Sequence, residues 1–148
     1  MITRLCEKTD IKKCAALFRK VFTSPPFQYE WLSEDSVFAY LSDMKDTPKF
    51  MGFVLQEEET GNIAAACFGI VSDYFLSPYY EIKEIFLSPN IQGKGKGSHF
   101  LSEIEKILFS KNIKSISLST EKTIPAYTFY QKNGYSSSTT SEYMFKNL

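Results

Sequence analysis

Residues 92–98 read Gln-Gly-Lys-Gly-Lys-Gly-Ser, and they join a strongly apolar stretch at 82–87 to an amphipathic stretch at 97–109. Glycines at every second position leave the backbone uncovered by Cβ atoms, so successive N–H groups can turn toward one bound anion. A helix beginning here adds its own unpaired N–H groups and the positive end of its macrodipole. The order of strand, glycine loop and helix N-terminus predicts a binding site for a phosphate or diphosphate.

The spacing of the glycines excludes two common phosphate loops. A P-loop requires Gly, four residues, then Gly-Lys-Ser/Thr, and no such register exists here. A dinucleotide fingerprint requires Gly-x-Gly-x-x-Gly inside an early βαβ unit, whereas Gly93, Gly95 and Gly97 give Gly-x-Gly-x-Gly late in the chain. The pattern that fits is Gln/Arg-x-x-Gly-x-Gly/Ala, met by Gln92, Gly95 and Gly97.

Composition limits the class of protein. The chain has 148 residues, of which 43% are hydrophobic, so we expect one domain over 1–148 with one buried core. The formal net charge is zero, which gives no general attraction to nucleic acid or an anionic membrane. No apolar run approaches the about 18 residues of a membrane-spanning helix, and the first residues lack a signal-peptide core. We therefore expect a cytoplasmic protein without nucleic-acid or membrane partners.

The cysteines and the single histidine argue against a metal centre. Cys6, Cys14 and Cys67 are scattered in apolar surroundings and are predicted to be reduced core thiols. His99 falls in the first turns of the helix after the loop, where the helix N-terminus disfavours its charged form. We predict a structural role for His99 and no metal.

Hydrophobic periodicity predicts alternating elements without internal repeats. Thr9 or Asp10 is a candidate cap for the first helix, and Ser33 for the second. The expected strands are 2–5, 50–56, 63–71, 80–87, 115–119 and 143–146, and the expected helices are 11–22, 34–44, 97–109 and 125–132. The order is βααβββαβαβ on a mixed α/β sheet, with room for one further strand near Tyr135.

Two more motifs accompany the glycine loop. Residues 84–89 read Glu-Ile-Phe-Leu-Ser-Pro, and residues 126–135 read Ala-Tyr-Thr-Phe-Tyr-Gln-Lys-Asn-Gly-Tyr. With the loop, they resemble three motifs of the GNAT superfamily of N-acetyltransferases, in the same order and over nearly the whole chain. The resemblance implies the acyl-CoA N-acyltransferase fold, in which helices flank a mixed sheet and two central strands splay apart after a bulge. It also implies acetyl-CoA as the cofactor.

The resemblance implies how the cofactor is held. The backbone of Phe86 and Leu87 would pair with the pantetheine arm, and the Leu87 N–H would polarise the thioester carbonyl. Two positions depart from the family pattern: Gln92 replaces the commoner Arg, whose charge Lys94 or Lys96 can supply, and Thr123 replaces Asn. The expected cofactor-binding residues are Phe86, Leu87, Gln92, Gly93, Lys94, Gly95, Lys96, Gly97, Ser98, Thr123 and Tyr130.

Two side chains are candidates for proton transfer. Glu84 is the candidate base, because apolar neighbours raise the pKa of a carboxyl group toward useful values. The alternatives are a solvated carboxylate or one paired with Lys83, and Glu81 is the second choice of base. Tyr130 is the candidate acid toward the departing thiolate, since a phenol is protonated at neutral pH. The alternative is a tyrosine that only packs in the core.

The acceptor is less well defined by the sequence. Aromatic residues with acidic neighbours suit a small amine with an apolar or cationic body. The predicted substrate-binding residues are Phe27, Tyr29, Trp31, Tyr74 and Tyr80. The alternative is that Phe27 and Trp31 only close the core.

Three functions remain open at this point. The leading hypothesis is acetylation of a small primary amine such as a polyamine or an aminoglycoside. The alternatives are acetylation of a peptide N-terminus or lysine, and a CoA-binding module without turnover. A homodimer is possible, because dimers are common in proteins that the chain resembles.

Overall fold

The computed structural model describes residues 1–30, 33–74 and 77–148, with Tyr74 described by its backbone alone. The chain forms two compact units, Met1–Leu118 and Ser119–Leu148. Among the described residues no helix has the length and apolar character needed to cross a membrane.

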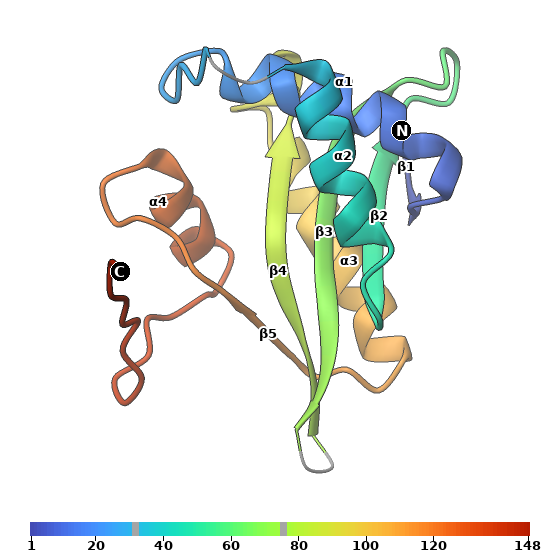
Figure 1. Ribbon diagram of the computed structural model, residues 1–148. Coiled ribbons are helices and arrows are strands. Elements are labelled where there is room, and N and C mark those ends of the chain that lie inside the picture. The colour runs from blue at the N-terminus through green and yellow to red at the C-terminus, as the bar shows by residue number, and fades with distance from the viewer. Residues whose placement is uncertain (31–32, 75–76) are drawn as a thin grey trace. The chain divides into compact units, whose positions relative to one another are not determined.

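The first unit is built on one sheet of five strands, and the sheet is mixed, as the sequence predicted (Figure 1). Each of the first four strands runs antiparallel to its neighbour, and the last two are parallel. In sheet order the strands are β1 (Ile2–Leu5), β2 (Phe50–Gln56), β3 (Ile63–Tyr74), β4 (Ser77–Leu87) and β5 (Ser115–Leu118). Strands β3 and β4 form a longer hairpin than the predicted 63–71 and 80–87.

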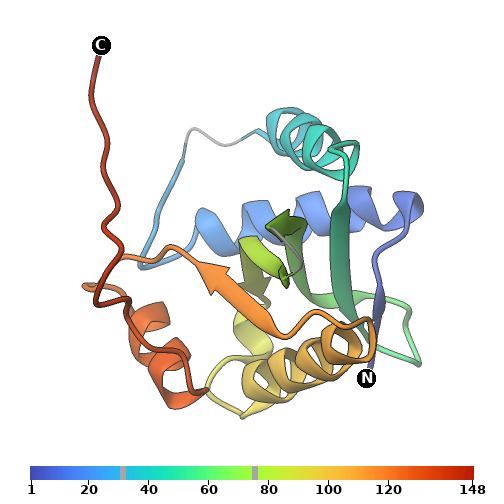
Figure 2. The same ribbon diagram turned by 90° about the horizontal axis from the view of Figure 1, so that it is seen from below.

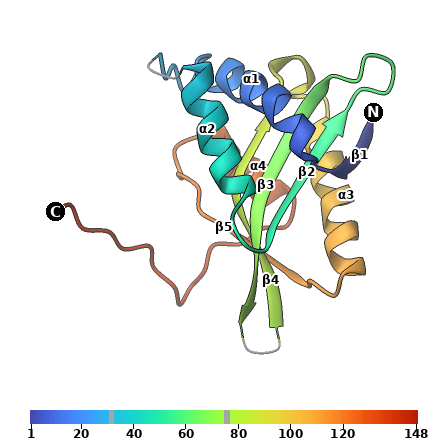
Figure 3. The same ribbon diagram turned by 45° about the vertical axis from the view of Figure 1, so that its right-hand side comes forward.

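Helices cover both faces of this sheet. Figure 2 shows α1 (Ile11–Phe22) and α2 (Glu34–Lys45) on one face and α3 (Lys96–Ser110) on the other. Figure 3 gives the same arrangement from the side. Short 3-10 turns, η1 (Lys8–Asp10) and η2 (Pro89–Ile91), precede α1 and the glycine loop. Cys6, Cys14 and Cys67 are buried and free, as predicted.

The two N-terminal helices begin in different ways. Ser33 caps α2 as predicted, because its Oγ accepts from the Ser36 N–H at 3.0 Å while Ser36 Oγ accepts from the Ser33 N–H at 3.2 Å. Asp10 stands at the N-cap position of α1, but its side chain does not cap the helix. Instead, its buried carboxylate accepts from both terminal nitrogens of Arg4, at 2.7 and 2.9 Å. The predicted capping role of Asp10 is therefore wrong.

A β-bulge in β4 changes which face its side chains occupy. Ile82 lies opposite Gly69 and Glu84 lies opposite Phe68, so Lys83 is an extra residue between the two pairs. Before the bulge, Tyr80 shares the face of Cys67, while after it Glu84 shares the opposite face with Phe68. Without the bulge, the period of two would put Tyr80 and Glu84 on one face.

The second unit contains one helix, α4 (Pro125–Lys132), with the predicted bounds. The predicted strand at 143–146 does not form, nor does one near Tyr135. The side chains of Tyr143, Met144 and Phe145 are 77%, 85% and 77% exposed. An alternating pattern makes a strand only where another strand accepts its backbone hydrogen bonds, and these residues have no such partner in the part of the chain that the structure describes.

The Arg4–Asp10 pair should stabilise the first unit in a pH-dependent way. The guanidinium hydrogen bonds lower the pKa of Asp10 from its ordinary 3.8, so the stabilisation is present above that pH and is lost as the pH falls through the folded-state pKa. We expect Asp10→Asn to lower the free energy of unfolding by about 1.5–3 kcal/mol at pH 7, measured by urea denaturation. The loss should shrink below about pH 4.

The exposed Asp43→Asn serves as the control and should change stability little. An Asp10→Asn effect of equal size at pH 7 and pH 3 would contradict this account.

Candidate active site

One edge of β4 is left without a neighbouring strand in its second half. The pairing of β4 with β5 ends at Ile82 opposite Leu118, one residue before the bulge. Strand β4 continues to Leu87 beside β3, while β5 leaves it at an angle (Figure 1). Among the described residues, no strand pairs with Lys83–Leu87 on that side.

The ladder between β3 and β4 decides which backbone groups face this open edge. The Ser88 N–H donates to the Ala64 carbonyl at 2.8 Å, so these two residues form a hydrogen-bonded pair. In an antiparallel ladder such pairs alternate with pairs whose backbone groups point away. Phe86 therefore bonds to β3, whereas the N–H and C=O groups of Ile85 and Leu87 point to the open edge. Ile85 thus offers the backbone groups that the sequence analysis expected from Phe86.

The glycine loop follows directly from this edge. Gly93 and Gly95 adopt left-handed φ values of 70° and 72°, which L side chains rarely take, and no described heavy atom lies within 4 Å of a Cβ built on either. Helix α3 begins at Lys96, and its first hydrogen bond runs from the His99 N–H to the Gly95 carbonyl at 3.0 Å. The N–H groups of 96–98 precede that bond and are therefore left to an external acceptor. Open space, free amides and a helix N-terminus fit a diphosphate.

Two side chains of the loop bond to the backbone near it. Gln92 Nε2 donates to the Leu87 carbonyl at 2.9 Å, so this side chain fastens the loop to the end of β4. Lys94 Nζ donates to the Asn90 carbonyl at 2.9 Å. Lys96 and Ser98 are exposed, and Gly97 is buried at the start of α3. Gln92 therefore connects the loop to β4, a role that the Arg of the family pattern did not suggest.

Glu84 lies within the open edge, and its side chain has a pKa that departs from the ordinary value. Its Oε1 accepts a hydrogen bond from the Tyr40 hydroxyl of α2 at 2.7 Å. Burial raises the pKa of Glu84 above its ordinary 4.5, and the hydrogen bond from Tyr40 opposes that rise. Burial and the adjacent carboxyl group also raise the pKa of Tyr40.

The other carboxylate of β4 has a different partner. Glu81 forms an ion pair with Lys83, at 2.7 Å between Oε1 and Nζ. Of the alternatives for Glu84, pairing with Lys83 is therefore wrong. The sequence analysis did not identify Tyr40. It lies three residues after Val37 and four before Met44, and this spacing places it next to the apolar face of the helix.

The structure describes the packing of some predicted acceptor residues but not of others. Phe27 and Tyr29 pack on Phe22 at the end of α1, with ring centroids 4.7 and 6.2 Å away, and Tyr29 remains 41% exposed. Trp31 lies outside the described residues, and the side chain of Tyr74 is not described.

Tyr80 was placed in the acceptor site by sequence and is corrected here. Its side chain is 0% exposed, and its hydroxyl donates to the Met51 carbonyl at 2.7 Å. The bulge at Lys83 turns Tyr80 toward the face of the sheet opposite to that of Glu84. A completely buried ring whose hydroxyl donates to the sheet backbone does not line an open site.

Tyr130 and Thr123 belong to the second unit. Tyr130 is buried within α4, with its ring centroid 5.4 Å from that of Phe129 and 5.6 Å from that of Tyr135. Its carbonyl accepts from the Tyr135 N–H at 3.0 Å, which folds the chain after the helix back on it. Thr123 is exposed in the turn before α4. Their roles stay predictions.

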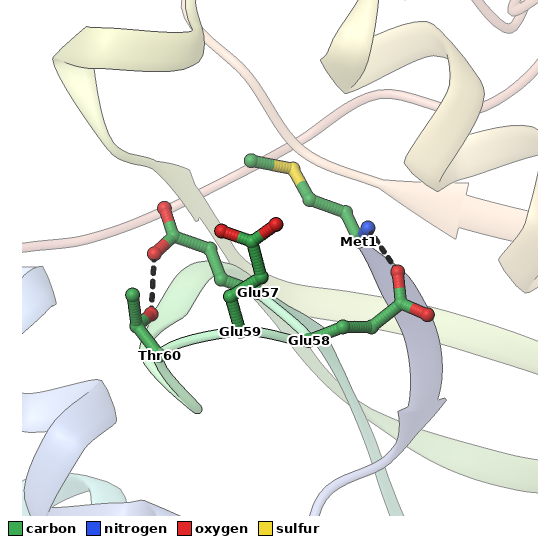
Figure 4. A pocket seen from close by; sticks show the side chains of 5 residues that line it. All are labelled: Met1, Glu57, Glu58, Glu59 and Thr60. Carbon is green, nitrogen blue, oxygen red and sulfur yellow. Dashed lines mark hydrogen bonds and ion pairs between the residues drawn. The ribbon is translucent and has the colours of Figure 1, made fainter.

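A hollow of about 580 Å³ lies in the first unit, beside the turn between β2 and β3 (Figure 4). Met1 and residues 57–60 line it, including three consecutive glutamates. The amino group of Met1 bonds to Glu58 at 2.5 Å, and the Thr60 hydroxyl bonds to Glu57 at 2.6 Å. This acidic lining does not suit a diphosphate.

Comparison with known proteins identifies the family. The model of the acetyltransferase (GNAT) family matches residues 15–135. The chain belongs to this family. Acetyl-CoA is the acetyl donor of GNAT enzymes, and the chain is accordingly an acyltransferase. A search of curated protein sequences gave no match.

Solved structures show the same fold. An integron cassette protein of V. cholerae is 19% identical with a TM-score of 0.81, covering 99% of this chain and 91% of that one. An acetyltransferase of Trypanosoma brucei is 21% identical with a TM-score of 0.71, covering 99% of both chains. An aminoglycoside 6′-N-acetyltransferase of Acinetobacter haemolyticus is 12% identical with a TM-score of 0.73, covering 100% and 99%.

The hydrogen bond of Gln92 should matter for cofactor affinity. Gln92→Met keeps the length of the side chain but removes the donor to the Leu87 carbonyl, so the loop is no longer fastened to β4. We expect the Kd for coenzyme A to rise by about two- to tenfold, measured by calorimetry, which corresponds to one ordinary hydrogen bond.

Gln92→Arg retains a donor at this position and is the matched variant, with affinity close to that of the unchanged protein. Equal affinities of Gln92→Met and the unchanged protein would contradict a fastening role.

Proposed function

We propose that this chain transfers the acetyl group of acetyl-CoA to the primary amine of a small molecule, by direct attack in a ternary complex. The observation that carries the proposal is the position of the open β4 edge immediately before the glycine loop. The edge offers the backbone groups of Ile85 and Leu87, and the loop offers the amides of 96–98. An extended amide-containing arm that ends in a diphosphate matches both.

The cofactor supplies an activated acetyl thioester when bound. Leu87 then presents its N–H as the donor to a carbonyl oxygen, which is an oxyanion site with one donor. Ile85 holds the arm through its backbone, and residues 93–98 hold the diphosphate. Because the donors belong to a strand and a helix terminus, they are fixed before the reaction begins.

Glu84 acts as the base toward the acceptor ammonium, directly or through a water. Burial raises its pKa above that of an ordinary carboxyl group, so it takes up a proton more readily than an ordinary carboxylate does. Tyr130 keeps a proton on its hydroxyl at neutral pH and delivers it to the departing sulfur. This role requires that both compact units work as one domain over 1–148, and the family match over 15–135, which spans both, supports that.

The acceptor is an amine with an apolar or cationic body, such as a polyamine or an aminoglycoside. The aromatic packing of Phe27 and Tyr29 on the end of α1 supports this choice. Similar folds include AAC(6′)-Iy, solved with the bisubstrate analogue CoA-S-monomethyl-acetylneamine. We place the protein in the cytoplasm.

The decisive test follows free thiol release from acetyl-CoA with polyamines, aminoglycosides and a lysine-containing peptide as acceptors. We expect transfer to a small amine, with kcat/KM falling as the pH drops through a Glu84 pKa above 4.5. Glu84→Gln should lose about 10²- to 10⁴-fold in kcat/KM and lose that acidic limb. Glu81→Gln is the matched control and should keep it.

Transfer to the peptide alone would replace the small-amine proposal by a protein acetyltransferase. Saturable binding of acetyl-CoA without transfer to any acceptor would instead indicate a binding module.

Tyr130→Phe separates a proton donor from a packing residue. The change keeps the buried ring and removes the hydroxyl, so we expect kcat to fall about 10²-fold while the Kd for acetyl-CoA stays nearly constant. Tyr127→Phe on the same helix is the control, since the Tyr127 hydroxyl lies 3.2 Å from Ser137 Oγ and has no assigned chemistry. An unchanged kcat in Tyr130→Phe would remove the acid role.

A further inference from the structure

Tyr40 connects α2 to the candidate base. Its hydroxyl donates to Glu84 Oε1 at 2.7 Å, across 44 residues of sequence. We propose that Tyr40 is a positioning residue, which holds one oxygen of the Glu84 carboxylate and so orients the other for proton uptake. The inference rests on the proposed function, because it concerns the base of that reaction.

Core contacts on one side orient the ring of Tyr40, a residue that remains 43% exposed. Val37 and Leu41, on either side of Tyr40 along α2, are 2% and 0% exposed, so this part of the helix is anchored in the core. The Phe18 ring meets the Tyr40 ring edge-on at 6.2 Å and meets the Phe86 ring at 5.1 Å. Phe86 is two residues beyond Glu84 and on the same face of β4. The Phe18 ring therefore contacts Tyr40 and also Phe86, the next residue after Glu84 on that face of β4.

The hydrogen bond leaves one carboxylate oxygen available. Oε1 is engaged by Tyr40, and Oε2 has no hydrogen-bond partner within the residues that the structure describes. With one oxygen held, the carboxylate has one defined orientation for the other. A proton taken from an ammonium group or a water would arrive at Oε2.

The surroundings of Glu84 contain few other charges. Helix α1 contributes the apolar Phe18, and β3 contributes Phe68 directly opposite. On β4 itself, Glu81 and Lys83 bond to each other. Tyr40 is thus the titratable group that offsets the effect of burial on Glu84. Because burial and the adjacent carboxyl group raise the pKa of Tyr40, the hydroxyl stays protonated and donates throughout the working pH range.

Tyr40→Phe removes the donor and keeps the ring. Burial then acts on Glu84 without opposition, so the pKa of Glu84 should rise by about one unit, as expected for a lost hydrogen bond to a charged group. The acidic limb of kcat/KM should move upward by the same amount. We expect kcat to fall about tenfold because the Glu84 carboxylate loses its defined orientation, while KM for acetyl-CoA is unchanged because Tyr40 acts through the base.

Two measurements test this inference. The first is a carbon-13 NMR titration of the side-chain carboxyl of Glu84 in the protein without acetyl-CoA, with the signal assigned by its disappearance in Glu84→Gln. A higher pKa in Tyr40→Phe supports the proposal, and an unchanged pKa overturns it. Tyr143→Phe, which removes a hydroxyl from a side chain that is 77% exposed, is the matched control and should leave the titration unchanged.

The second measurement is a double-mutant comparison in the transfer assay. In the Glu84→Gln background, Tyr40→Phe should cause no further loss of kcat, whereas an additional tenfold loss would show that Tyr40 acts independently of Glu84 and would overturn the proposal. If no acceptor is acetylated by the unchanged protein, the proposed function fails. The NMR titration still decides separately whether Tyr40 controls Glu84.

Discussion

The extra residue at Lys83 is the constraint from which the arrangement of the site follows. It lets one strand place Tyr80 and Glu84 on opposite faces of the sheet, although the two positions are an even number of residues apart. The pairing of β4 with β5 stops one residue before it. Strand β4 is therefore an ordinary inner strand before the bulge and an open edge after it. Bulges are frequent beside active sites because they redirect side chains and end pairing in this way.

The open edge and the start of α3 present two sets of unpaired backbone donors, and the glycine loop lies between them. Leu87 ends the strand, and Gln92 ties the loop to its carbonyl. Helix α3 then begins with its first amides unpaired. These donors are backbone N–H groups, so their presence depends little on side-chain identity. That explains how the same fold occurs in solved acetyltransferases that are only 12–21% identical to this chain.

The side chains that pack near Glu84 belong to α1, α2 and β4. Phe18, Phe86 and Tyr40 pack together between α1, α2 and β4, and their contacts bring the Tyr40 hydroxyl to Glu84. The aromatic residues at the end of α1 continue this packing through Phe22. Most aromatic side chains of this unit therefore pack into the core, whereas Tyr29 and Tyr40 remain 41% and 43% exposed.

The sequence by itself determined the glycine loop, the elements on either side of it and the family, because these depend on local spacing and on backbone geometry that glycine permits. It also singled out Glu84 as a carboxylate among apolar neighbours. Only the tertiary structure decided that Tyr80 is core, that Ile85 rather than Phe86 faces the open edge, and that Tyr40 reaches Glu84. Those facts depend on the strand register and on contacts between distant segments. A one-residue shift in register reverses every side chain of a strand, and no local pattern in the chain records it.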